Sequence, residues 1–234
     1  MLQTVSKAFF HFLASNKTLK ALASRYGIQG DSGFARRFIA GETVAEAIQA
    51  ARQLQASGLS VTLDHLGETV ATVAEADAAT RAYVGVMADV AGAGIERNLS
   101  LKLTQLGLTI DRATSVDNLR RILDAANAKA FFVRIDMEDS PFTAVTLDIF
   151  ETMWQQGYRN AGIVLQSYLR RSEADAARVN ALGARVRLVK GAYNEPRDVA
   201  YLAKSEVDAS FVRIMKLLLA EGHYPAIATH DPAM

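Results

Sequence analysis

The sequence contains no cysteine, and this absence excludes several kinds of chemistry at once. Without thiols the chain forms no disulfide, uses no thiolate nucleophile and holds no zinc or iron–sulfur centre through cysteine ligands. Long hydrophobic runs are missing too, since no apolar stretch approaches the roughly 18 residues of a membrane span. The N-terminal stretch MLQTVSKAFFHFLASNK has a short apolar patch without a cleavage site after it, and therefore predicts an amphipathic helix.

A surplus of charge of one sign is also absent. The sequence has 26 Lys and Arg against 25 Asp and Glu, which gives a net charge of +1 at pH 7. A nucleic-acid-binding surface requires clustered Lys and Arg, so we expect no nucleic-acid partner. The histidines, at positions 11, 65, 223 and 230, lack a metal-ligand spacing such as H-E-x-x-H, and we expect no metal site. The sequence also contains no P-loop and no nucleophile elbow.

The sequence does contain an alternation of strand-like and helix-like segments. Short β-branched or aliphatic runs, typical of buried strands, occupy residues 59–63, 99–103, 131–136, 162–166, 186–190 and 226–230. Helical patterns lie between them, with expected start signals at Thr43, Thr72, Ser115, Ser140–Pro141 and Ser172, and a last helix over residues 201–221. This order predicts an α/β fold in which helices cover a parallel sheet.

Two α/β arrangements fit that alternation, and the distribution of polar residues separates them. A doubly wound sheet concentrates its site at one switch point, whereas a (β/α)8 barrel builds its site from the C-terminal ends of several strands. Polar residues lie at the C-terminal ends of all six strand-like segments: Asp64–His65, Lys102, Asp136, Gln166, Lys190 and His230. The sequence therefore predicts a (β/α)8 TIM-type barrel over residues 59–234, with about six of its eight strands present. A helical segment over residues 1–58, closed by Gly58, would precede it.

Residues 185–193, RVRLVKGAY, combine a buried strand with features of a binding site. The apolar residues alternate with Arg187, and the strand ends in Lys190, Gly191 and Tyr193. Charged side chains are rarely buried without a partner, and glycine allows a close backbone approach. The segment is either a site at the end of a strand or a strand end with two solvated cations.

Three other strand ends carry candidate groups. Asp136 can orient a cationic amine, act as a base, or only cap the acidic loop that follows it. Lys102 interrupts an apolar run, which an edge position or an anionic ligand would explain. Gln166 can donate and accept hydrogen bonds toward a heteroaromatic ring, or it can be structural.

Seven segments, in this order along nearly the whole chain, together resemble the proline dehydrogenase family. They are FARRFIAGET (34–43), VTLDHLGE (61–68), LSLKLTQLGL (99–108), FFVRIDMED (131–139), GIVLQSYLRR (162–171), RVRLVKGAYNEP (185–196) and ATHD (228–231). The resemblance implies a FAD-dependent barrel enzyme that oxidises L-proline to 1-pyrroline-5-carboxylate, the first step of proline catabolism. It further implies that hydride passes to flavin N5 and that the electrons then reach a quinone.

The resemblance also implies roles for individual residues. Asp136 matches the family's active-site aspartate, and Arg187 matches the catalytic arginine placed against the flavin. Lys102 matches the lysine that binds the substrate carboxylate, and Tyr193 matches a tyrosine of the substrate pocket. The positions matched to flavin contacts are Met137, Gln166, Arg187, Lys190, Gly191, Ala192, Thr229 and His230. Arginine and lysine beside the isoalloxazine would stabilise its anionic reduced form.

The chain departs from the family pattern in two places. Asp231 stands where the family usually has asparagine after ATH, and it would bring negative charge near the flavin unless it turns away. The Tyr-x-x-Arg-Arg motif of the family's last barrel helix does not occur before Met234. We therefore expect a C-terminally truncated barrel with low activity. The alternative is a catalytically incompetent barrel that binds flavin or acts only as a binding module. A quinone acceptor would imply a cytoplasmic protein at the inner face of the cell membrane, in peripheral contact with it.

Overall fold

The computed structural model describes residues 40–67 and 69–234. The chain divides into two units, Met1–Ser60 and Val61–Met234. The helices expected before residue 40 lie outside the described residues.

In the first unit, α3 (Val44–Ala56) begins where the sequence predicts. The hydroxyl of Thr43 accepts a hydrogen bond from Glu46 N at 3.3 Å, and the Glu46 carboxylate accepts one from Thr43 N at 3.2 Å. This reciprocal pair satisfies backbone N–H groups that a helix start otherwise leaves free. Gly58 follows the helix with a φ of +78°, a left-handed conformation that glycine adopts without steric cost.

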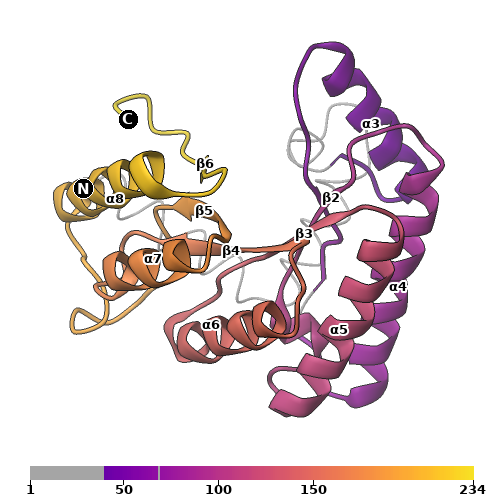
Figure 1. Ribbon diagram of the computed structural model, residues 1–234, viewed down its shortest axis with the longest axis horizontal. Coiled ribbons are helices and arrows are strands. Elements are labelled where there is room, and N and C mark those ends of the chain that lie inside the picture. The colour runs from indigo at the N-terminus through magenta and orange to yellow at the C-terminus, as the bar shows by residue number, and fades with distance from the viewer. Residues whose placement is uncertain (1–39, 68) are drawn as a thin grey trace, which may run out of the picture. The chain divides into compact units, whose positions relative to one another are not determined.

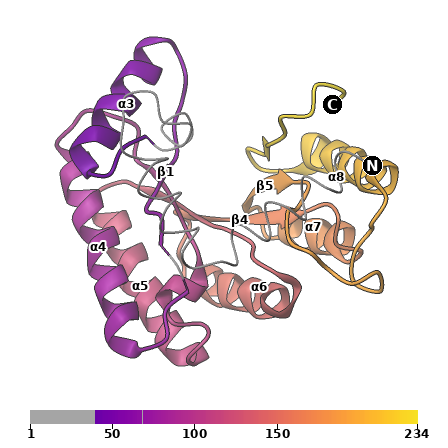
Figure 2. The ribbon, with the colours of Figure 1, turned by 180° about the vertical axis from the view of Figure 1, so that it is seen from behind.

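The second unit is built on one parallel sheet. In the part of the chain that the structure describes, its strands are β1 (Leu63–Asp64), β2 (Asn98–Leu101), β3 (Phe132–Ile135), β4 (Ala161–Gln166), β5 (Arg185–Val189) and β6 (Ala226–Ile227). Each strand pairs in parallel with the next one along the chain. Sequential order without reversal is typical of a barrel and not of a doubly wound sheet. Figures 1 and 2 show the sheet curled as a half-barrel, which confirms the predicted fold class.

Helices connect these strands along the outer side of the curled sheet. Those described in this unit are α4 (Val73–Ala91), the 3₁₀-helix η2 (Leu103–Leu106), α5 (Arg112–Ala128), α6 (Ser140–Gln155), α7 (Ser172–Ala181) and α8 (Lys204–Glu221). In Figures 1 and 2, α4 and α5 lie side by side, and α6 to α8 follow the sheet toward β5 and β6. The helix predicted over residues 72–91 is present as α4 and begins one residue later, because Thr72 caps it: its hydroxyl accepts a hydrogen bond from Glu75 N at 3.2 Å.

The two faces of the sheet carry different residues. On β3, Val133 and Ile135 are fully buried on the side of the helices. Arg134 and Asp136 point to the other, concave side, because successive side chains along a strand alternate. The parallel register extends this division to the other strands. It places on the concave face Thr62, Asp64, Ser100, Lys102, Phe132, Arg134, Asp136, Gly162, Gln166, Arg185 and Arg187. The fold thus collects polar and charged residues on one side of the sheet.

The predicted starts of two helices are wrong by a few residues. The cap of α5 is Asp111, whose carboxylate accepts a hydrogen bond from Thr114 N at 2.7 Å. Ser115, the predicted cap, is buried inside this helix. The last helix, α8, begins at Lys204 and not at residue 201.

Two more starts are displaced by one position. Asp139 occupies the cap of α6, so Ser140 is the first helical residue and Pro141 the second. Ser172 is the first residue of α7 and does not cap it. Its hydroxyl donates instead to the carbonyl of Gln166 at 2.6 Å, and so ties the helix start to the end of β4.

The first and last strands are shorter than their apolar patterns. The prediction for residues 59–63 overlaps β1 only at Leu63, because strand pairing is limited to Leu63 with Leu99 and Asp64 with Ser100. The prediction for residues 226–230 is right only for the first two residues, which form β6. The polar residues that follow β6 are therefore on a loop.

Gly162, on β4, is a position where the concave face admits no side chain. A Cβ atom there would lie 2.6 Å from Phe132 Cζ, 2.7 Å from Arg185 O and 2.9 Å from Arg134 Nη1. We expect Gly162→Ala to lower the free energy of unfolding by about 1–3 kcal/mol, as overpacking of a core does, in equilibrium urea denaturation.

Gly85→Ala, within α4, is the matched control for this substitution. No described atom lies within 4 Å of a Cβ added at Gly85, and alanine favours a helix over glycine, so stability should not fall. An unfolding midpoint for Gly162→Ala equal to that of the parent would contradict the close approach at β4.

Candidate active site

Arg187 extends across the concave face and joins four strands of the sheet. From β5, its Nη1 atom lies 3.5 Å from Asp136 Oδ1 and donates to Ser100 Oγ at 3.2 Å. Its Nη2 atom donates to Thr62 Oγ1, directly before β1, at 3.4 Å. Side chains from β5 and β1 can meet only because the sheet curls. The guanidinium therefore lies over the centre of the concave face.

Lys102 lies on the same face as Arg187, and its ammonium makes only long contacts with the described residues. Its Nζ atom is 3.5 Å from Asp64 Oδ2 and 3.7 Å from Asp136 Oδ2, distances of ion pairs but not of hydrogen bonds. Its side chain makes no hydrogen bond with any residue in the described ranges 40–67 and 69–234. An ammonium has three N–H donors, so Lys102 can bind an additional anion without giving up a short contact.

Asp136 links the two cations. Its side chain is only 21% exposed and pairs with Lys102 through one oxygen and with Arg187 through the other. Burial raises the pKa of the Asp136 carboxyl above its ordinary value, while Lys102 and Arg187 act in the opposite direction. The carboxyl consequently takes up a proton at a higher pH than a solvated aspartate does.

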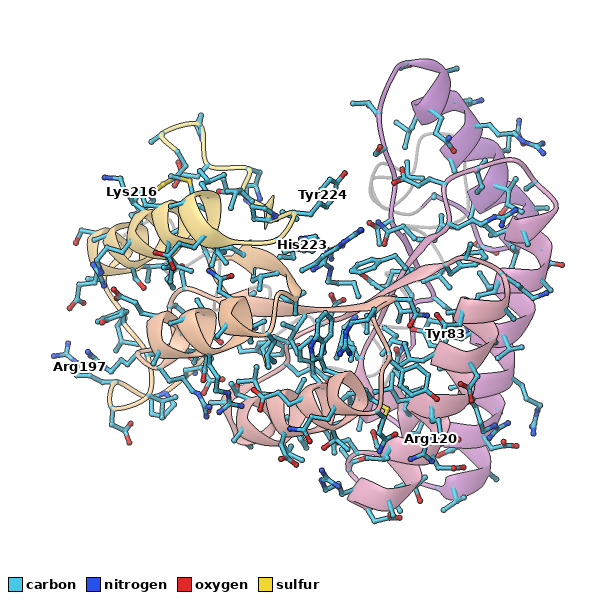
Figure 3. All side chains as sticks on the ribbon, viewed as in Figure 1. Tyr83, Arg120, Arg197, Lys216, His223 and Tyr224 are labelled. Carbon is cyan, nitrogen blue, oxygen red and sulfur yellow. The ribbon has the colours of Figure 1, made fainter. Side chains whose placement is uncertain are left out.

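A further cation, Arg134, lies next to Asp136 on the same face of β3. Its Nη1 atom donates to Arg185 O at 3.0 Å, and its guanidinium carbon lies 4.8 Å from the centre of the Phe132 ring. Burial lowers the pKa of Arg134 to about 9, so it is still charged at neutral pH. Tyr224, labelled in Figure 3, completes this layer by stacking on Arg185 with a separation of 4.8 Å. The site thus rests on a layer of arginine and aromatic side chains.

Gln166, at the end of β4, presents a free acceptor. Its Nε2 atom donates to Met137 O at 3.1 Å, whereas its Oε1 atom is buried and has no hydrogen-bond partner among the described residues. Buried acceptors are normally paired, so this oxygen can receive a donor from a ligand. Met137, which supplies the carbonyl, is itself only 5% exposed.

Gly191 and Lys190 follow β5. Gly191 has a φ of +107°, and a Cβ atom there would lie 2.3 Å from the Tyr168 ring, so only glycine fits. Lys190, unlike Lys102, makes two short hydrogen bonds: its Nζ atom lies 2.6 Å from Asp208 Oδ1 and also contacts Asp231 Oδ2. The negative charge of Asp231 is therefore directed at Lys190.

Two carboxylates anchor the loops around the site. Glu138 accepts hydrogen bonds from Thr104 N at 3.2 Å and from Thr104 Oγ1 at 2.6 Å, and burial raises the pKa of its carboxyl. Glu195 accepts from Ser140 N at 2.7 Å, which ties the loop that carries Tyr193 to the start of α6. Tyr193 itself is 41% exposed.

The sequence-predicted residues are therefore brought together to different degrees. Asp136, Arg187 and Lys102 form one ion-paired group. Met137 directly follows Asp136 after β3, and Gln166 lies at the end of the next strand, β4. Ala192, Thr229 and His230 are exposed on the loops after β5 and β6. Of these three, Thr229 makes a local contact, because its hydroxyl accepts a hydrogen bond from Asp231 N at 3.1 Å.

Sequence reasoning missed three polar neighbours of the central group. The sequence marks Asp64 only as a polar residue at a strand end, and it places Ser100 and Thr62 within apolar strand-like segments. No sequence signal marks Ser100 and Thr62 as neighbours of Arg187. Only the register of the folded sheet, in which Ser100 pairs with Arg134 and Asp64 with Ser100, shows that they share the concave face.

Comparison with known proteins places the chain in a family. The family profile described as proline dehydrogenase matches residues 47–233. The chain belongs to the proline dehydrogenase family. Proline dehydrogenase 2 of Bacillus subtilis (strain 168) is 39% identical over 230 residues, which cover 98% of this chain and 75% of that protein. Proline dehydrogenase of Deinococcus radiodurans is 38% identical over 201 residues, which cover 84% of this chain and 65% of that protein.

The fold agrees with that of a solved structure. The crystal structure of proline utilization A (PutA) from Bdellovibrio bacteriovorus, inactivated by N-propargylglycine, matches with a TM-score of 0.79 and 28% identity. The match covers 85% of this chain and 26% of that chain, so this chain corresponds to about a quarter of that PutA.

Proposed function

We propose that this chain oxidises L-proline to 1-pyrroline-5-carboxylate, the first step of proline catabolism. Membership of the proline dehydrogenase family supports the reaction. The observation that carries the proposal is the state of Lys102: an ammonium on the concave face whose only partners among the described residues are the long ion pairs with Asp64 and Asp136. The carboxylate of an amino acid is an anion that such a lysine can bind.

We propose FAD as the cofactor, because the residues at the C-terminal ends of β4 and β5 fit a flavin. The free, buried Oε1 atom of Gln166 can accept a hydrogen bond from a ring N–H. The absence of a side chain at Gly191 allows a close approach of a ligand to the backbone. Arg187 supplies positive charge over the same face. Bound FAD would supply the acceptor for the hydride that leaves the proline ring.

The chain's own residues then have separate tasks in the proposal. Lys102 binds the proline carboxylate, and Asp136 holds both Lys102 and Arg187 in place through its two oxygens. Met137 contributes a buried apolar wall. Tyr193, on the loop anchored by Glu195, covers the substrate side and excludes water. The remaining expected cofactor contacts are Lys190, Ala192, Thr229 and His230.

The electron acceptor is part of the same proposal. We expect a quinone to take the electrons, with the protein in the cytoplasm and in peripheral contact with the inner face of the cell membrane. Among the residues that the structure describes, no helix combines the length and the apolarity that crossing a membrane requires.

The proposal is tested by reconstitution and turnover. Protein incubated with excess FAD and freed of unbound cofactor should show flavin absorbance, and NAD should leave its melting temperature unchanged. The reconstituted protein should then reduce a redox dye, or a soluble quinone, only when L-proline is added. Flavin binding without turnover would favour the binding-module alternative, and a melting temperature raised by NAD but not by FAD would falsify the choice of cofactor.

A further inference from the structure

Four charged side chains join the ends of β5 and β6 to the start of α8. Lys190 follows β5, Lys204 and Asp208 lie in the first turns of α8, and Asp231 follows β6. Lys190 Nζ lies 2.6 Å from Asp208 Oδ1 and 2.5 Å from Asp231 Oδ2. Lys204 Nζ lies 2.7 Å from Asp231 Oδ2 and also contacts Asp208 Oδ2. We call these four residues the four-charge cluster.

The charges of the four-charge cluster cancel. Two lysines and two aspartates alternate, so each ammonium faces two carboxylates. Hydrogen bonds from Lys190 and Lys204 hold the pKa of the Asp231 carboxyl well below its ordinary value. Hydrogen bonds to Asp208 and Asp231 raise the pKa of Lys190. All four groups are therefore ionised around neutral pH, and their net charge is zero.

The environment of the cluster differs from that of an ordinary surface pair. The side chains of Lys190, Asp208 and Asp231 are 22%, 21% and 16% exposed, whereas Lys204 is 69% exposed. The three inner groups are thus partly shielded from water and salt, which strengthens their interaction relative to exposed pairs. Lys204 closes the cluster from the solvent side.

Lys102 and Lys190, the two lysines at strand ends, therefore differ in how their ammonium groups can interact with a ligand. Within the described part of the chain, Lys102 has only long ion pairs, so its charge is available to a ligand anion. Lys190 already makes two short charge-assisted hydrogen bonds, which fix the direction of its ammonium and neutralise it. Of its three N–H donors, one remains for another partner.

We propose that Asp208 and Asp231 are positioning residues, which orient the Lys190 ammonium and cancel its charge, so that Lys190 offers bound FAD a directed hydrogen-bond donor without net positive charge. This inference rests on the proposed function, because it concerns how Lys190 acts on the cofactor. Positive charge over the flavin is then supplied by Arg187 and not by Lys190. The aspartate at position 231 has a defined task, which is to complete the neutral cluster.

The test is the midpoint potential of the bound flavin in charge-altered variants of the reconstituted protein. Two-electron reduction adds negative charge to the flavin ring, so uncompensated positive charge nearby favours the reduced form. Asp208→Asn leaves the cluster with a net charge of +1. We expect the ratio of reduced to oxidised flavin at a fixed potential to rise by about three- to tenfold, which equals a shift of about +14 to +30 mV for a two-electron couple.

Lys190→Met leaves a net charge of −1 and should shift the potential in the opposite direction. The double variant Asp208→Asn with Lys190→Met is neutral again but lacks the Lys190 donor. Its potential should therefore recover from that of Lys190→Met toward the parent value and lie between those of the two single variants. If these residues served only the fold, the double variant would show no recovery. The losses of stability in the two single variants would instead add. Asp231→Asn makes the same charge change at a second position. It serves in place of Asp208→Asn if that variant does not retain FAD.

Glu173→Gln serves as the control. It removes an exposed ion pair between α7 and α8, Arg213 Nε to Glu173 Oε2 at 3.0 Å, without touching the four-charge cluster. Its flavin potential and FAD content should equal those of the parent. A parent protein that binds no FAD would overturn the proposed function itself. FAD binding with unshifted potentials in all the cluster variants, or no recovery in the double variant, would overturn only the inference about Asp208 and Asp231.

Discussion

Replacement of Lys102 by methionine should lower kcat/KM for L-proline by roughly 30- to 1000-fold in the reconstituted protein. Methionine keeps an unbranched side chain of comparable length but removes the charge. Loss of one charged partner at a partly dry site costs about 2–4 kcal/mol, which gives this range. The measurement is steady-state reduction of a dye as a function of proline concentration, and the KM for proline should rise.

FAD content should stay unchanged in this variant, because Lys102 is proposed to bind substrate and not cofactor. Lys216→Met is the matched control: it removes an exposed lysine of α8, labelled in Figure 3, and should alter no kinetic constant. Parent-like kinetics of Lys102→Met would mean that the two long ion pairs of Lys102 are its whole role.

Asp136→Asn should reduce kcat/KM by about 10- to 150-fold, since Lys102 and Arg187 both lose a charged partner worth about 1.5–3 kcal/mol. The pH dependence provides a more specific prediction. Because burial raises the pKa of Asp136, kcat/KM of the parent should fall on acidification at a pH above that at which an ordinary aspartate is protonated. This acid limb should be absent from the pH profile of Asp136→Asn. Asp148→Asn, which removes an exposed pair with Arg112, is the control and should keep it.

Asp136→Asn should not lower the stability of the protein, although it lowers kcat/KM. A carboxyl whose pKa is higher in the folded than in the unfolded state stabilises the fold while it is protonated. This stabilisation is lost as the pH rises through the pKa of the folded state. At neutral pH the ionised carboxylate of Asp136 therefore costs stability. The asparagine variant should unfold at the same urea concentration as the parent or at a higher one. A strongly destabilised variant would show that Asp136 serves the fold more than the reaction.

The sequence predicts the strand ends well and the contacts between them poorly. Asp136, Lys102 and Gln166 could be found because each polar residue directly follows an apolar run, and a parallel sheet brings such ends to one edge. Thr62 and Ser100 could not be found, because a hydroxyl inside a strand carries no sign of the distant arginine that it contacts. Arg187 reaches Thr62 across 125 residues, and only the curl of the sheet defines that pair.

The displaced element boundaries have a similar origin. Residues 59–62 have the composition of a strand, but a strand is defined by its pairing, and β1 pairs with β2 at only two positions. Ser115 resembles a cap as much as Asp111 does. The geometry that decides between them is the hydrogen bond from Thr114 N to the carboxylate of Asp111. Lys204 and Asp208 resemble an ordinary i,i+4 pair on a solvated helix, and nothing local indicates that Lys190 and Asp231 join them.

The sequential order of the strands has a consequence for how the protein acquires its site. Every strand pairs with its neighbour in the chain, so each pairing closes a short loop and can form without waiting for the rest. The contacts of Arg187 with Asp136 and Thr62 span 51 and 125 residues, and they require β5 to be in place and the sheet to be bent. The sheet can thus grow strand by strand, while the group formed by Arg187, Asp136 and Thr62 assembles only after β5 has joined the bent sheet. A ligand that recognises this group binds only the finished arrangement, and it therefore stabilises complete molecules over partly folded ones.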